Sequence, residues 1–112
     1  MTDIARRRVS RADWVYQEPV TRSEGGQPIG NGRMATLLWT SPSAIHLQIN
    51  RSDVFAVNKS HRGEQYGPAD YCSACAQVVI DLGGNVFAGP DFRQHLALYQ
   101  AECTVQGTGV GV

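Results

Sequence analysis

The chain has 112 residues, of which 42% are hydrophobic and 18% are charged, and its ten basic and ten acidic side chains cancel. This length suffices for one small domain with a modest core. The balanced charge argues against a nucleic-acid-binding protein, because contacts to phosphates require a basic excess. No apolar stretch approaches the roughly 20 residues of a membrane-spanning helix, and no apolar segment follows the N-terminal arginines as in a secretory signal. We therefore expect neither nucleic acid nor membrane among the partners.

The N-terminal residues 1–13 are polar and charged, show no regular period, and include three consecutive arginines at positions 6–8. Because chain termini of this kind are commonly disordered, we expect a loose, solvated lead-in. A basic arm for a membrane surface or a nucleic acid is the alternative. Residues 14–16 are short and aromatic and predict a first strand, after which residues 23–28 form a loop by composition.

The strongest local signal is a β-hairpin over residues 34–50. An Asn-Gly turn precedes an apolar run that fits a buried strand, and a Ser-Pro-Ser turn follows it. The second strand alternates between apolar and polar side chains over seven residues, as a half-buried strand does. This alternation places Ile45, Leu47 and Ile49 on the buried face. His46 falls on the opposite face, where we expect a surface histidine.

Three more strands are expected, at residues 76–82, 94–100 and 102–106, with Leu96 and Leu98 facing inward on the second. Residues 58–70 predict a long polar loop, a kind of segment that is often functional. No amphipathic helix of ten or more residues emerges. Short strands separated by turns indicate an antiparallel sandwich or barrel. We predict an all-β fold, an antiparallel β-sandwich over residues 14–112.

The three cysteines, Cys72, Cys75 and Cys103, are an odd number, which argues against a fully paired disulfide framework. Cys72 and Cys75 have the spacing of half a zinc site, but no second ligand pair of the usual spacing follows. A redox pair of this kind would accompany a βαβ pattern, which is absent from the sequence. We therefore predict no metal and no cofactor, and keep a small metal or thiol protein as a minor alternative.

Two ordered motifs carry a family resemblance. The segment 28–33 reads Pro-Ile-Gly-Asn-Gly-Arg and is followed by the apolar hairpin, which ends at Ile49 and Asn50. With Trp14 before it, this order resembles the N-terminal domain of glycoside hydrolase family ninety-five, the α-L-fucosidase-like enzymes. The run Asn-Arg-Ser-Asp-Val-Phe at 50–55 and the run Asp-Tyr-Cys-Ser-Ala-Cys at 70–75 more closely resemble a related domain-of-unknown-function family. The resemblance covers about residues 14–110.

The chain departs from the hydrolase pattern at two positions. Ala35 stands where the family usually has glycine, and Arg51 replaces the acidic residue after the strand-end asparagine. Fucosidase specificity therefore does not carry over. The resemblance implies a truncated super-sandwich, a C-terminal helical-barrel domain of the same parent protein that holds the catalytic carboxyl groups, and an extracytoplasmic or secreted setting. Sheet edges left without partners in such a fragment would promote self-association.

We therefore expect a non-catalytic sandwich domain of a glycoside-hydrolase-like protein that acts on carbohydrate. A free-standing carbohydrate-binding module is the alternative. Hydrolysis needs two carboxyl groups at a fixed separation, and no such pair stands out in the sequence, so we assign no catalytic residue. Trp39, inside an apolar strand, is expected in the core. Arg33 is expected either to form a structural ion pair with a carboxylate such as Asp53 or to contact sugar, and Asp53 has the same two alternatives. The predicted substrate-binding residues are Trp14, Asn31, Arg33, Asn50, Arg51 and Asp53.

Overall fold

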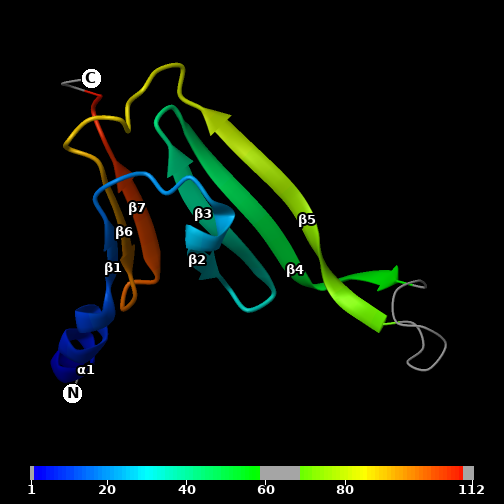
Figure 1. The fold of residues 1–112 in the computed structure, drawn as a ribbon. Coiled ribbons are helices and arrows are strands. Elements are labelled where there is room, and N and C mark those ends of the chain that lie inside the picture. Colours follow the sequence, from blue (N-terminus) through cyan, green and yellow to red (C-terminus); the bar gives the residue numbers. More distant parts are fainter. Residues whose placement is uncertain (1, 59–68, 110–112) are drawn as a thin grey trace.

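The computed structural model describes residues 2–58 and 69–109 and contains two antiparallel β-sheets (Figure 1). This arrangement confirms the predicted all-β sandwich. One sheet has the strand order β1-β6-β7 and the other has the order β2-β3-β4-β5. The strands are β1 (Trp14–Tyr16), β2 (Gln27–Gly30), β3 (Met34–Ser41), β4 (Ala44–Asn58), β5 (Ala69–Asp81), β6 (Arg93–Ala97) and β7 (Glu102–Gln106).

The N-terminal segment is helical, so the prediction of a lead-in without regular structure was wrong. It forms α1 (Thr2–Val9) and a 3₁₀ turn, Ser10–Ala12. Asp3 lies in the first turn of α1 and pairs with Arg7 at 2.8 Å, one helical turn later. This order of charges suits both the helix dipole and the (i, i+4) spacing. The three arginines were read as a solvated run, which hid this pattern.

The β3–β4 hairpin has the predicted position, with pairs running from Met34–Arg51 to Ser41–Ala44. β2 was not expected, because its Gln-Pro-Ile-Gly sequence has the composition of a loop. It pairs with β3 alone and forms an edge of its sheet, and an edge strand tolerates a proline such as Pro28. β4 and β5 are also longer than predicted, and the part of the expected loop at 59–68 lies outside the described residues.

A buried polar cluster joins the two sheets. Gln27 on β2, Thr40 on β3 and Gln94 on β6 have no exposed surface. Gln94 donates from Nε2 to Gln27 Oε1 at 3.2 Å and to the Leu38 carbonyl at 3.1 Å, and accepts from Thr40 Oγ1 at 3.4 Å. Gln27 in turn donates to the Trp14 carbonyl at 2.8 Å. These bonds fix the facing register of the sheets, because a buried amide without partners would be costly.

Burial decreases across the face of the larger sheet that meets Gln94. On β3, Leu38 is 9% exposed. Its cross-strand neighbour Leu47 on β4 is half-buried, and the next neighbour, Val78 on β5, is 37% exposed. Two residues further along β5, on the same face, Ile80 is 44% exposed. The smaller sheet therefore covers β2 and β3 but leaves the apolar face of β5 open.

The opposite face of the larger sheet holds Trp39, which is buried as predicted, at 6% exposure. Its indole stacks on the ring of His46 with centroids 5.2 Å apart, and His46 Nε2 lies 3.2 Å from Ser41 Oγ. His46 is therefore half-buried rather than the surface histidine expected from the alternating pattern, because its ring lies against the indole of the neighbouring strand.

Part of the core comes from the irregular segment between β5 and β6. Phe87 and Phe92 are 5% and 3% exposed and meet edge to face, with ring centroids 5.6 Å apart. The backbone N–H of Phe87 donates to the Pro42 carbonyl at 2.9 Å, which joins this segment to the β3–β4 turn. Leu96 is buried as predicted, but Leu98 is 41% exposed because β6 ends at Ala97.

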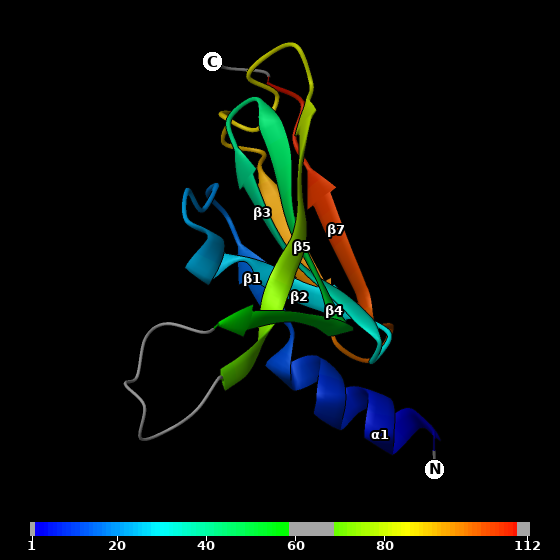
Figure 2. The same ribbon diagram turned by 90° about the vertical axis from the view of Figure 1, so that its right-hand side faces the viewer.

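The molecule is open rather than compact. Its radius of gyration is 18.1 Å, whereas a compact chain of this length would have about 13 Å. Its extents are 57 × 45 × 18 Å, and the β4–β5 pair projects from the rest (Figures 1 and 2). β5 forms the outer edge of its sheet, so one side of its backbone has no neighbouring strand among the described residues.

Candidate functional site

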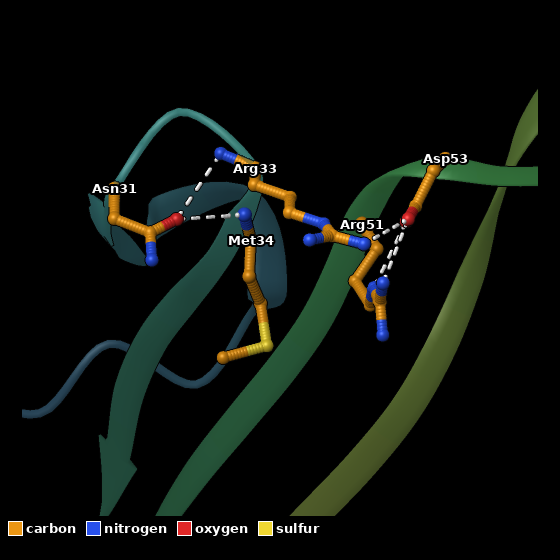
Figure 3. A network of polar contacts seen from close by, with 5 residues as sticks. All are labelled: Asn31, Arg33, Met34, Arg51 and Asp53. Carbon is orange, nitrogen blue, oxygen red and sulfur yellow. Dashed lines mark hydrogen bonds and ion pairs between the residues drawn. The ribbon is translucent and has the colours of Figure 1, made fainter.

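The turn between β2 and β3 is built by the side chain of Asn31. Its Oδ1 accepts hydrogen bonds from the backbone N–H groups of Arg33 at 3.1 Å and Met34 at 2.9 Å. The backbone N–H of Asn31 donates to the Met34 carbonyl at 3.0 Å. Gly32 has φ +89°, a conformation that favours glycine. This Asn-Gly geometry holds the first residues of β3 in place, and Arg33 projects from it (Figure 3).

A bulge in β4 lies beside this turn. Asn50 pairs with Ala74 and Phe55 with Cys72, so residues 51–54 of β4 face a single residue of β5. The backbone N–H of Ser52 donates instead to the Arg33 carbonyl at 2.9 Å. Bulges bend a strand and redirect its side chains. This one brings the side chains of Arg51 and Asp53 together beside Arg33.

Arg33, Arg51 and Asp53 form an ion cluster, which we call the Arg–Asp cluster (Figure 3). Arg51 binds the carboxylate with two donors, Nε to Oδ1 at 2.9 Å and Nη2 to Oδ2 at 2.7 Å. Arg33 adds a bond from Nη2 to Oδ2 at 3.0 Å. The predicted pairing of Arg33 with Asp53 is confirmed. The partner Arg51 was not expected for this bond, since the sequence did not show the bulge.

The cluster is solvated and carries an excess positive charge. The side chains of Arg33, Arg51 and Asp53 are 72%, 41% and 44% exposed. Hydrogen bonds from Arg51, and then from Arg33, lower the pKa of Asp53 below its ordinary value. The bond to Asp53 raises the pKa of Arg51. The carboxylate is thus ionised at neutral pH, and two guanidinium charges against one carboxylate charge leave a net charge of +1.

Two open, mainly apolar pockets flank the turn. One of about 350 Å³ is lined by side chains of β2, β3 and β4, among them Ile29, Met34 and Ile49, and by Ala101 from the β6–β7 turn. The other, of about 180 Å³, is lined by residues of the turn and the bulge, among them Arg33 and Asn50. Charged hydrogen-bonding groups therefore lie next to apolar surface, a combination that suits the two kinds of surface on a sugar ring.

Five of the six predicted substrate-binding residues lie together at this end of the larger sheet. They are Asn31, Arg33, Asn50, Arg51 and Asp53. Trp14 does not join them. It lies on β1 in the other sheet, 43% exposed, with its ring packed edge to face on Tyr16. Met34 was not among the predicted site residues, because its sequence context is that of an ordinary apolar strand residue. It is 50% exposed and lines both pockets.

The cysteines do not assemble into a site within the described part of the chain. Cys103 contacts Gln27 Oε1 through its sulfur at 3.2 Å, and burial raises the pKa of its thiol, which disfavours the reactive thiolate. Cys75 is exposed on β5, and the side chain of Cys72 lies outside the described residues. Among the side chains that the structure describes, no group of three or more histidine, cysteine or acidic residues is placed to hold a metal ion.

Among the described residues, no helix is long and apolar enough to cross a membrane. A comparison of the chain with protein-family models found no match. Comparisons with curated proteins and with solved structures also found none. The resemblance to family ninety-five therefore remains a hypothesis based on the two sequence motifs.

Proposed function

We propose that this chain is a non-catalytic sandwich domain of a glycoside-hydrolase-like protein, which contacts carbohydrate through the Arg–Asp cluster and supports a helical-barrel catalytic domain. The observation that carries the proposal is the convergence of Arg33, Arg51 and Asp53 beside two apolar pockets. Exposed hydrogen-bonding groups next to apolar surface suit the hydroxyl rim and the C–H face of a sugar.

The chemistry of Asp53 supports a binding role over a catalytic one. Glycoside hydrolysis uses two carboxyl groups, one of which is a general acid with a raised pKa. The Arg–Asp cluster contains one carboxylate, and its two arginine partners lower its pKa. Asp53 would therefore have no proton to donate to a leaving group at neutral pH. In this proposal the catalytic carboxyl groups belong to the barrel domain.

Binding to a panel of oligosaccharides tests the sugar-contact part of the proposal. The wild-type chain is expected to bind at least one sugar class, and Arg33→Ala is expected to weaken that binding. Arg93→Ala is the matched control, because Arg93 is an exposed strand arginine of the other sheet. Absence of binding to any sugar, or equal binding by both variants, would contradict a sugar-contact role for the cluster.

A free-standing carbohydrate-binding module is the alternative function. Trp14 favours it, because a 43% exposed indole offers a flat apolar face for a sugar ring. Reading the native gene beyond the codon of Val112 separates the two functions. A following segment with the periodicity of a helical barrel supports the supporting-domain role. A gene that stops there supports the role of a free-standing binding module.

We also propose that β5 is a site of self-association, with a second copy of this chain as its occupant. Val79 and Ile80 are 55% and 44% exposed, and β5 is an edge strand with charge absent from residues 74–80. An apolar edge without charges pairs readily with another strand. Antiparallel pairing of two β5 strands would satisfy the open backbone edge in both copies and place these apolar side chains beside their counterparts.

A further inference from the structure

Two acceptor groups of this surface, the Asp53 carboxylate and the Asn31 amide oxygen, are already engaged. Asp53 accepts three hydrogen bonds from the two arginines, and a carboxylate has about four acceptor positions. Asn31 Oδ1 accepts two backbone N–H groups, which occupy both lone pairs of an amide oxygen. These two groups therefore offer little acceptor capacity to the hydroxyl protons of a ligand.

Donors remain in excess at the same place. Arg33 uses one of its five N–H donors on Asp53, and Arg51 uses two of its five. Four of the five N–H donors of Arg33 and three of those of Arg51 are therefore not used by Asp53. The exposure of the Arg33 side chain, 72%, leaves its guanidinium accessible to a ligand.

The balance of charge agrees with the balance of hydrogen bonds. Two guanidinium groups and one carboxylate carry a net charge of +1. Asp53 binds both arginines through the same oxygen, Oδ2, and so holds the two guanidinium groups close together. A planar guanidinium matches a carboxylate or sulfate group with two parallel hydrogen bonds. Such a group supplies acceptors only, which matches the donors of the two arginines that Asp53 does not use.

We propose that the Arg–Asp cluster selects acidic saccharides, those carrying a uronate carboxylate or a sulfate ester, over neutral ones. This inference rests on the proposed carbohydrate-binding function. Arg33 is the residue that contacts the anionic group. Asp53 is a positioning residue, because it holds Arg33 and Arg51 together and has little acceptor capacity left for the sugar. The pocket of about 180 Å³, which Arg33 and Arg51 line, takes the apolar face of the ring.

Calorimetric titration of the full chain tests the inference with three ligands of equal length: an oligogalacturonide, its carboxyl-reduced neutral form, and a sulfated neutral oligosaccharide. The acidic ligands are expected to bind more tightly than the neutral one, by about two- to fivefold for an exposed charge pair. The advantage is expected to shrink as salt rises from about 0.02 to 0.15 M, because the Debye length falls from about 20 Å to 8 Å. A preference for one acidic ligand over the other tells carboxylate from sulfate.

Three variants complete the test. Arg33→Gln is expected to abolish the acidic preference, Arg33→Lys to retain part of it through charge alone, and Arg93→Gln to leave it unchanged. Thermal unfolding of each variant checks that the fold persists, as expected for a side chain this exposed. Equal binding of neutral and acidic ligands, both lost in Arg33→Gln, would overturn the inference and leave the proposed function intact. Binding of none of the three would count against both, and an acidic preference that survives Arg33→Gln would overturn the assigned site.

Discussion

Replacing Gln94 by alanine is expected to destabilise the sandwich strongly. The side chain is fully buried and makes three hydrogen bonds that span the two sheets. Its removal leaves the Leu38 carbonyl and the Thr40 hydroxyl without this partner, at about 1–3 kcal/mol for each buried group left unsatisfied. The cavity adds to this cost. The Thr40 hydroxyl can rotate away from the lost partner, so it does not incur the full penalty. We therefore expect the free energy of unfolding to fall by about 3 kcal/mol, a large fraction of the total stability of a small domain.

Urea unfolding followed by tryptophan fluorescence measures this loss, since Trp39 is buried in the native state. Gln94→Met, which retains most of the volume, is expected to recover the cavity part of the loss but not the hydrogen-bond part. Gln100→Ala, at an exposed position in the β6–β7 turn, is the control and is expected to change stability by less than about 0.5 kcal/mol. A Gln94→Ala variant as stable as this control would refute the view that the polar cluster joins the sheets.

Three further predictions concern backbone space, pH and the open sheet edge. Gly107→Ala is expected to lower the free energy of unfolding by about 1–3 kcal/mol, measured by thermal unfolding, because a Cβ there would lie 2.5 Å from the Val86 carbonyl oxygen. Gly84 has open space around it, so the control Gly84→Ala is expected to be neutral or slightly stabilising. A hydrogen bond from the backbone N–H of Leu98 lowers the pKa of Asp13 below 3.8. The ionised Asp13 carboxylate therefore stabilises the fold above pH 3.8, and this stabilisation is lost as the pH falls through the lowered pKa. Asp13→Asn is therefore expected to reduce the fall in melting temperature on acidification, and an identical acid profile would contradict this. Ile80→Lys is expected to shift sedimentation of concentrated protein towards the monomer, and unchanged sedimentation would count against self-association through β5.

The strands that could be predicted from the sequence are those whose pattern is local. Alternation of apolar and polar side chains identified β4, and a short aromatic run identified β1. β2 could not be found in this way, since an edge strand tolerates a proline that a central strand would not. Phe87 and Phe92 were not recognised as core residues because they lie in a segment without a period, and only the path of the chain between the sheets buries them.

The candidate site was predicted in part. The fit of a guanidinium to a carboxylate predicted that Arg33 pairs with an acidic residue such as Asp53, and the structure confirms this contact. The role of Arg51 depends on the bulge in β4, and nothing in the local sequence marks that change of register. Trp14 was grouped with the site because it is aromatic and belongs to the resemblance. Its strand pairs with β6, which places it in the other sheet.

Whether the Arg–Asp cluster binds carbohydrate can be measured by backbone amide NMR during titration with an acidic oligosaccharide, which reports where the sugar lies as well as whether it binds. We expect saturable shifts concentrated in the turn at residues 30–35 and the bulge at residues 50–54, and their loss in Arg33→Gln. Shifts confined to Trp14 and its neighbours on β1, or no saturable shifts with any sugar, would contradict the assignment of the Arg–Asp cluster as a carbohydrate site.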